Sequence, residues 1–201
     1  MKEYLTFSNE ELERLHALKG MNITCLYGDP IEAALVSNDL TVIFHPLDLS
    51  APVTSGREEE VIRLAVESRP EESFKGTSWN ILGQDIGTLE HAWFGRTCVT
   101  FTDLHPVGST QLLGVELPAG MSFSAVFIDP NDEQMMDALR SERRSIVYVD
   151  LAFHFTTSKS HSTVIYVDGV RYLCFLSLNG APLDKLGNLQ LEESIQWVQL
   201  F

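Results

Sequence analysis

The stretch YVDLAFHFTTSKSHSTVIYVDGVRYLCFL, from Tyr148 to Leu176, determines the fold expected for the C-terminal half of the chain. Apolar and polar residues alternate through it, and two turn-rich segments interrupt the alternation, which predicts three antiparallel strands. The dipeptide Asp168-Gly169 between β-branched residues is typical of a two-residue type I′ hairpin turn. Such a turn pairs Ile165 with Tyr172.

The register of the first hairpin follows from its apolar face, because a slip of one residue would turn that face toward solvent. The match predicts that Phe153 lies opposite Ile165. The residues that share this face on the first strand are Val147, Val149, Leu151, Phe153 and Phe155.

Two histidines flank the Ser- and Lys-rich tip of this hairpin. The register places His154 on the opposite face, near Val164, and His161 in the loop. Asp150 shares a face with His154, but four residues at strand rise separate the two by about 13 Å. We therefore expect no catalytic pair between them.

The N-terminal region predicts a helix from about Asn9 to Lys19. Ser8 and Glu11 have the spacing of a capping box, a leucine stripe follows, and Gly20 is a typical stop.

Period-two patterns recur between this helix and the final strands. NITCLY, IEAALV and LTVIFH predict an antiparallel meander, and residues 59–68 favour a strand over a helix. Residues 68–88 are polar and irregular, with Trp79 and Ile81 as expected core anchors. Three further strands are expected in AWFGRTCVTF, QLLGVEL and MSFSAVFI.

A second helix is expected near residues 130–143, with Pro130 at its first position. These elements predict an α+β fold that is predominantly antiparallel β, with meanders forming a sandwich or a partly open barrel. Residues 1–201 are expected to form a single domain, with a possible subdivision near residues 68–78.

Charge is the one unusual feature of the composition. The chain has 201 residues, 28 Asp and Glu against 14 Lys and Arg, and a formal net charge of −14. Nucleic acids need clustered basic side chains and an anionic membrane would repel this surface, so neither is expected as a partner. A protein with a basic surface would be attracted. Solubility alone is the competing explanation for the acidity.

Cysteine usage and hydropathy favour a cytoplasmic protein. The chain has three distant cysteines and no apolar run that approaches the roughly 20 residues of a membrane span. An odd number of separated cysteines suits buried thiols better than a disulfide framework. The first fifteen residues lack the pattern of a secretory signal peptide.

The strict catalytic motifs of P-loop, dinucleotide-binding, zinc-protease and α/β-hydrolase enzymes do not occur in the sequence. No cofactor is expected, and no residue is assigned a catalytic role. Residues near the ends of two predicted strands could supply two imidazoles and two carboxylates, an acceptable ligand set for a divalent metal. This metal site is the alternative hypothesis, because nothing in the sequence shows that the two strand ends meet. The set is His45, Asp48, Asp103 and His105.

Runs of glutamate beside turns are the candidate partner-binding residues. Solvated surface is their ordinary interpretation, and presenting negative charge to a partner is more plausible than proton transfer. These residues are Glu58, Glu59, Glu60, Glu71 and Glu72.

Three functions remain as hypotheses. The first is a non-enzymatic, acidic, cytosolic protein-binding module, with an immunity-type inhibitor of a basic toxin or effector domain as its specific form. The second is a small-molecule or metal-binding barrel or sandwich, with a hydrolase as its enzymatic form and with His45, His105 or His154 at its mouth. The third is a homo-oligomer subunit that uses a strand edge or the C-terminal WVQLF.

Overall fold

The computed structural model describes residues 2–38, 40–52, 58–70, 80–102, 110–112, 115–117, 124–141, 146–167, 175–178 and 194–201. Its helices are α1 (Asn9–Ala17) and α2 (Glu133–Ser141). Its strands are β1 (Lys2–Leu5), β2 (Asn22–Gly28), β3 (Ala33–Ser37), β4 (Thr41–Pro52), β5 (Glu58–Ser68), β6 (Asn80–Thr102), β7 (Thr110–Leu112), β8 (Val115–Leu117), β9 (Ser124–Ile128), β10 (Ile146–Thr157), β11 (Ser162–Tyr166), β12 (Phe175–Leu178) and β13 (Gln196–Gln199).

One sheet holds most of these strands, in the order β12-β11-β10-β6-β2-β3-β4-β5, while β7 and β8 form a separate hairpin. β9 and β13 pair with β6, and β1 runs parallel to β10. No pairing in the described chain joins β12 to β5, so the sheet is open and is not a closed barrel. The expected α+β fold with mainly antiparallel strands and an N-terminal helix is confirmed.

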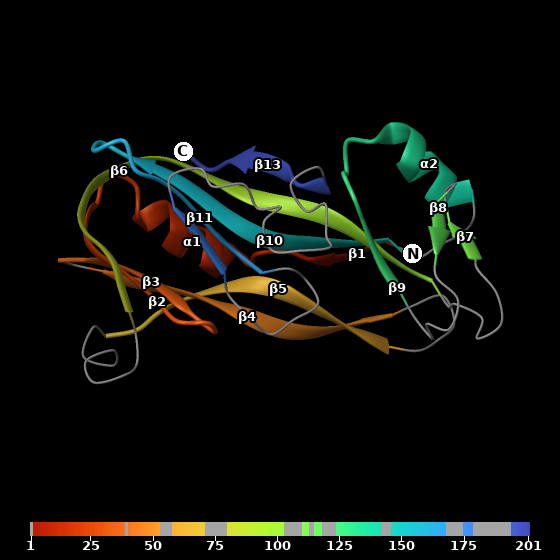
Figure 1. Cartoon of the computed structure of the whole chain (residues 1–201), viewed down its shortest axis with the longest axis horizontal. Coiled ribbons are helices and arrows are strands. Elements are labelled where there is room, and N and C mark those ends of the chain that lie inside the picture. The colour runs from red at the N-terminus through yellow and green to blue at the C-terminus, as the bar shows by residue number, and fades with distance from the viewer. Residues whose placement is uncertain are drawn as a thin grey trace.

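The long strand β6 connects two layers of this sheet (Figure 1). Residues 80–88 pair with β2 in the lower layer, and residues 89–99 pair with β10 in the upper layer. The strand turns at Asp85 and Gly87, whose φ angles are 49° and 100°. At Gly87 a Cβ atom would lie 2.9 Å from Ser158 Oγ, so glycine is required both by conformation and by space.

The two layers pack face to face around one apolar core. Phe44 of β4 stacks on Phe153 of β10 with 5.0 Å between ring centroids. All five residues of the predicted apolar face of β10 are buried in this core, which confirms that face. A bulge between Asp150 and Ala152 interrupts the pairing of β10 with β6.

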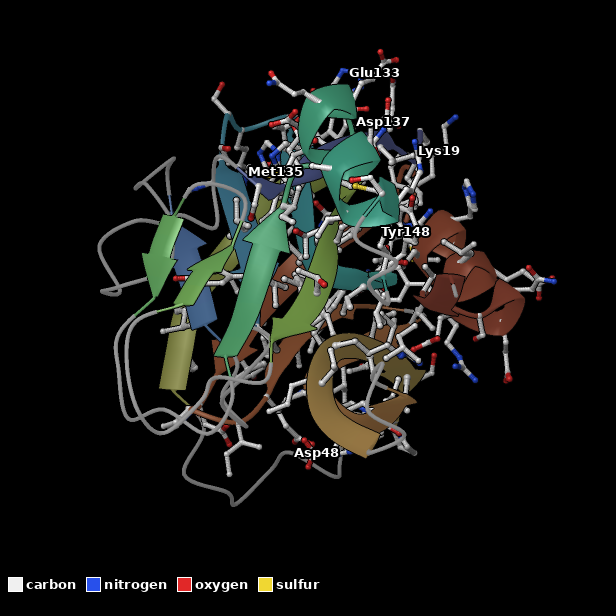
Figure 2. The ribbon with its side chains drawn as sticks, turned by 90° about the vertical axis from the view of Figure 1, so that its right-hand side faces the viewer. Lys19, Asp48, Glu133, Met135, Asp137 and Tyr148 are labelled. Atoms are coloured by element: carbon white, nitrogen blue, oxygen red, sulfur yellow. The ribbon has the colours of Figure 1, made fainter. Side chains whose placement is uncertain are left out.

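The N-terminal helix lies between the levels of the two layers, at the side of the sandwich (Figures 1 and 2). The predicted capping box is present, because Ser8 Oγ accepts the Glu11 amide and the Glu11 carboxylate accepts the Ser8 amide. Glu11 also forms a two-point ion pair with Arg63 of β5 and accepts the Val66 amide at 3.0 Å. Arg14 donates to the Val66 carbonyl oxygen. The helix therefore covers the outer edge of β5.

The second helix begins later than expected. Asp132 accepts the Met135 amide at 3.0 Å and caps a helix that starts at Glu133, so Pro130 precedes the helix and is not its first residue. Met136 and Leu139 are buried against the upper layer. Glu133 and Asp137 point away from the sheet (Figure 2). Neither helix of the described chain is long and apolar enough to cross a bilayer.

The predicted register is correct for the pairing of β10 with β11 and wrong for the pairing of β11 with β12. Phe153 pairs with Ile165 and His154 with Val164, as expected. Ile165, however, pairs with Leu176 and not with Tyr172. Tyr166 pairs with Phe175, so β12 has a different register from the one that a turn at Asp168-Gly169 would give, and this dipeptide itself lies outside the described residues.

Two strands are longer than the predicted segments LTVIFH and AWFGRTCVTF. β6 already begins at Asn80, and Ile81 is 54% exposed, so it is not a core anchor; Trp79 lies outside the described residues. β4 continues past Pro46 to Pro52. The preference for a strand at residues 59–68 is confirmed by β5.

Candidate functional site

The glutamates predicted to bind a partner are only partly within the described chain. Glu58, Glu59 and Glu60 begin β5, where their backbones pair with residues 50–52 of β4. Their side chains, and the whole of Glu71 and Glu72, lie outside the described residues. Their role stays a prediction.

The proposed metal ligands His45 and Asp48 do not converge. Both lie inside β4, not beyond a strand end, and the pairing of β4 with β5 is unbroken there. Residues three apart on a regular strand point to opposite faces, so these side chains cannot share an ion. Nδ1 of His45 donates to the Pro46 carbonyl at 3.1 Å, and Asp48 is exposed at the edge of the lower layer (Figure 2).

The other half of that ligand set, Asp103 and His105, lies outside the described residues. Within the part of the chain that the structure describes, no three His, Cys, Asp or Glu side chains gather as a metal site would require.

The Ser- and Lys-rich tip between β10 and β11 is attached to the bend of β6. Thr157 Oγ1 donates to the Ile86 carbonyl at 2.6 Å, and the Lys159 amine contacts the Asp85 carboxylate at 2.5 Å. The Ser158 amide donates to the Thr88 carbonyl. The tip between β10 and β11 is therefore bonded to the bend of β6. His161 lies in this loop, as predicted.

Asp150 also has a structural position. Arg96 donates two hydrogen bonds to its carboxylate, at 2.7 and 3.1 Å, and the Phe7 amide donates a third at 2.7 Å. These bonds attach the segment before α1 to the upper layer. The carboxylate is occupied, in keeping with the expectation that it does not pair with His154.

The most distinctive group of side chains is a set of four aromatic rings, the aromatic cluster, which we define as His91, Trp93, His154 and Trp197. The His154 ring stacks on Trp93 with 4.9 Å between centroids and meets Trp197 edge-on at 5.6 Å. His91 lies 6.0 Å from Trp93. His91 is exposed and the other three are partly exposed, so the cluster is accessible from solvent.

Strand register brings these rings together. Trp93 of β6 pairs directly with His154 of β10 on one side and with Gln199 of β13 on the other. Trp197 pairs with Gly95. A Cβ atom at Gly95 would lie 3.1 Å from the Trp197 ring, so the glycine leaves the space that this ring covers.

His154 is held in a defined orientation. Its Nε2 lies 3.0 Å from Ser162 Oγ, a diagonal neighbour across β10 and β11. Burial between the rings lowers the pKa of His154, which favours the neutral imidazole at pH 7. The contacts of His154 with other side chains of the described chain are those with Ser162, Trp93 and Trp197, and none of these is a carboxylate.

Sequence reasoning identified His154 but missed both tryptophans. Trp93 lies in a strand that was predicted, and its direct pairing with His154 depends on which strands are neighbours. Trp197 arrives from the far C-terminal segment, whose docking beside β6 leaves no local pattern. The available signal was the two-residue spacing of Trp93 and Gly95, which places a large ring and a glycine side by side on one face of a strand.

Comparison with protein-family models, with curated proteins and with solved structures finds no match to this chain. We therefore infer a function from the residues and the geometry of the chain itself.

Proposed function

We propose that the chain is an acidic, cytoplasmic protein-binding module that recognises a partner with a basic surface. The observation that carries this proposal is the solvent-accessible aromatic cluster with two tryptophans on a sheet face. Tryptophan is strongly enriched among the residues that contribute most to binding between proteins, and it is uncommon as isolated exposed surface.

The backbone around the cluster favours binding without a large ordering cost. Trp93 and His154 lie on adjacent paired strands, and Trp197 rests over Gly95. Rings held on a sheet lose little side-chain freedom when a partner covers them. Each indole offers an apolar face and one N–H donor, which suits an interface that is apolar at its centre and polar at its rim.

The charge of the chain favours a basic partner. A net charge of −14 creates a field that attracts cationic surfaces and accelerates association at low ionic strength. Indole faces also attract Lys and Arg side chains. An uncharged or acidic partner would gain neither effect.

An inhibitor of the immunity type is the specific form of this proposal. Such a protein neutralises a basic toxin or effector domain by covering its functional surface. The acidity of the chain and the convergence of rings on one face support this form, and the glutamates at the start of β5 are candidates for additional contacts.

Affinity capture from the native cells tests the proposal. Immobilised wild-type protein is compared with Trp197→Ala and with Ile81→Ala, a matched control because Ile81 is a large exposed apolar residue on the other arm of β6. We expect a protein of high isoelectric point to be retained at low salt by the wild type and by Ile81→Ala, and lost from Trp197→Ala. Equal retention by all three, or no retained protein at low salt, would overturn the proposal.

A further inference from the structure

The strand β13 forms the outer border of the upper layer beside the aromatic cluster. It pairs antiparallel with β6, with Gln196 opposite Arg96 and Val198 opposite Phe94. The pairing continues beyond the strand, because the Leu200 amide donates to the Ala92 carbonyl at 2.8 Å and the Ala92 amide donates to the Phe201 carbonyl.

These bonds fix which backbone groups of β13 face outward. Leu200 directs its amide toward β6, and the alternation of an antiparallel ladder gives Val198 the same direction. The N–H and C=O groups of Trp197 and Gln199 therefore point away from β6. Within the described residues these outward groups have no hydrogen-bond partner, and no other strand pairs with β13.

This edge differs from the edge of β5, which the chain itself protects. There Glu11 accepts the Val66 amide and Arg14 donates to the Val66 carbonyl, so both outward groups of Val66 are satisfied. Proteins commonly block exposed edges with charges, proline or a covering helix. β13, with the sequence Gln-Trp-Val-Gln, has no charge and no proline.

We propose that β13 accepts an extended segment of the partner protein as an added strand, with a Lys or Arg side chain of that segment over the Trp197 indole. This inference rests on the function proposed above and adds its mode of recognition. The open backbone groups of Trp197 and Gln199 require a main chain in extended conformation. The indole and the net charge of −14 favour a basic segment.

A second copy of this chain fits the edge less well. Pairing of β13 with itself would bring two bodies of net charge −14 together, and β13 carries no basic residue to offset the repulsion. Sedimentation of the free protein tests this alternative. A dimer that the edge variant below abolishes would overturn the proposal of a basic segment.

The edge can be blocked without touching the ladder to β6. Gln199→Pro removes the outward amide of residue 199, a substitution that edge strands tolerate when the lost N–H faces solvent. Gln199→Ala is the matched control, because it removes the side chain and keeps the amide. Thermal unfolding of both variants establishes that they fold.

The probe is a random decapeptide library displayed on phage and selected on the full-length wild-type protein. We expect enrichment of extended, alternating sequences that contain Lys or Arg. A synthetic peptide from the selection should bind Gln199→Pro roughly tenfold more weakly than the wild type, and Gln199→Ala within about twofold. On the wild-type protein, the amides of Trp197 and Gln199 should become protected from hydrogen exchange when the peptide binds.

A second measurement does not depend on any protein variant. In an added strand, every second backbone amide of the peptide faces β13 and the others face away. N-methylation of the amides that face β13 should abolish binding, and N-methylation of the others should leave it unchanged. Binding that is insensitive to both N-methylation and Gln199→Pro would overturn the edge proposal, as would a selection without enriched peptides. In either case, partner capture that depends on Trp197 would leave the proposed function standing.

Discussion

The imidazole of His154 stacks on the indole of Trp93, with 4.9 Å between ring centroids and 24° between ring planes. The two residues are direct partners in the ladder between β10 and β6. Stacking of this kind fixes one face of each ring against the other. The Trp197 edge then orients His154 from a third strand, so the aromatic cluster depends on the correct assembly of the upper layer.

Stability should respond to pH through His154. Burial lowers its pKa in the folded protein, so the unfolded chain binds more protons at this residue just below pH 6.5. The contribution of the neutral ring is complete above that pH and is lost as the pH falls toward the lowered folded pKa. We expect the free energy of unfolding by denaturant to fall less between pH 7.5 and 5.5 in His154→Gln than in the wild type.

The control for this experiment is His161→Gln, since His161 lies in the loop and makes no ring contact with the aromatic cluster. This variant should keep the wild-type pH dependence. Equal slopes for wild type and His154→Gln would contradict the burial of His154 among the rings.

The ion pair between α1 and β5 should be important for stability. Burial alone would raise the pKa of Glu11, but hydrogen bonds from Arg63 and from the Ser8 and Val66 amides, together with the Arg63 charge, lower it overall. Glu11→Gln leaves Arg63 buried without its counter-charge, and we expect a loss of about 3–5 kcal/mol in the free energy of unfolding. Urea denaturation at pH 7 measures this loss.

The lowered pKa of Glu11 also makes the free energy of unfolding depend on pH in the acidic range. Its contribution is present above the unfolded pKa of about 4.3 and is lost as the pH falls through the lower folded value. Glu10→Gln is the control, because Glu10 is exposed and pairs with Arg14 one turn away on the helix surface. It should cost less than about 0.5 kcal/mol. Similar losses for both variants would contradict the account of the buried pair.

Gly95 should be required for the position of Trp197. A Cβ atom there would lie 2.8 Å from Ile195 Cγ2, 3.0 Å from Ala152 Cβ and 3.1 Å from the Trp197 ring. We expect Gly95→Ala to destabilise the protein by about 1–3 kcal/mol and to shift the indole N–H resonance of Trp197.

Gly20→Ala is the control, because it adds backbone strain without crowding any neighbouring side chain. Gly20 has a φ of 74° and no neighbour within 4 Å of a built Cβ, so its substitution costs only the backbone strain of about 1–2 kcal/mol. The Trp197 resonance should not move in this variant. An unchanged resonance in Gly95→Ala would show that Trp197 does not rest on Gly95.

Local signals predicted the elements that depend on neighbouring residues. The capping box at Ser8 and Glu11 specifies the start of α1, and the apolar face of β10 specifies the pairing of Phe153 with Ile165. The turn signal at Asp168-Gly169 predicted the wrong register, since Ile165 pairs with Leu176 and not with Tyr172.

The site could not be predicted to the same extent. Alternation did not reveal the strand at residues 80–88, because the adjacent residues Ile81 and Leu82 are both exposed and do not form one buried face. His154 was placed on the correct face, but its partners Trp93 and Trp197 come from two other strands. The contacts of His154 with both tryptophans therefore depend on which strands are neighbours in the sheet.

The most direct test of the central claim, that the aromatic cluster is the partner-binding surface, is a calorimetric titration of the captured basic protein into wild type, Trp197→Ala and Ile81→Ala. We predict that Trp197→Ala weakens binding by roughly 30-fold or more, as expected for a residue at the centre of an interface. Ile81→Ala should bind as the wild type does, and raising the salt from low to physiological concentration should weaken binding in both. Wild-type affinity in Trp197→Ala would contradict the claim.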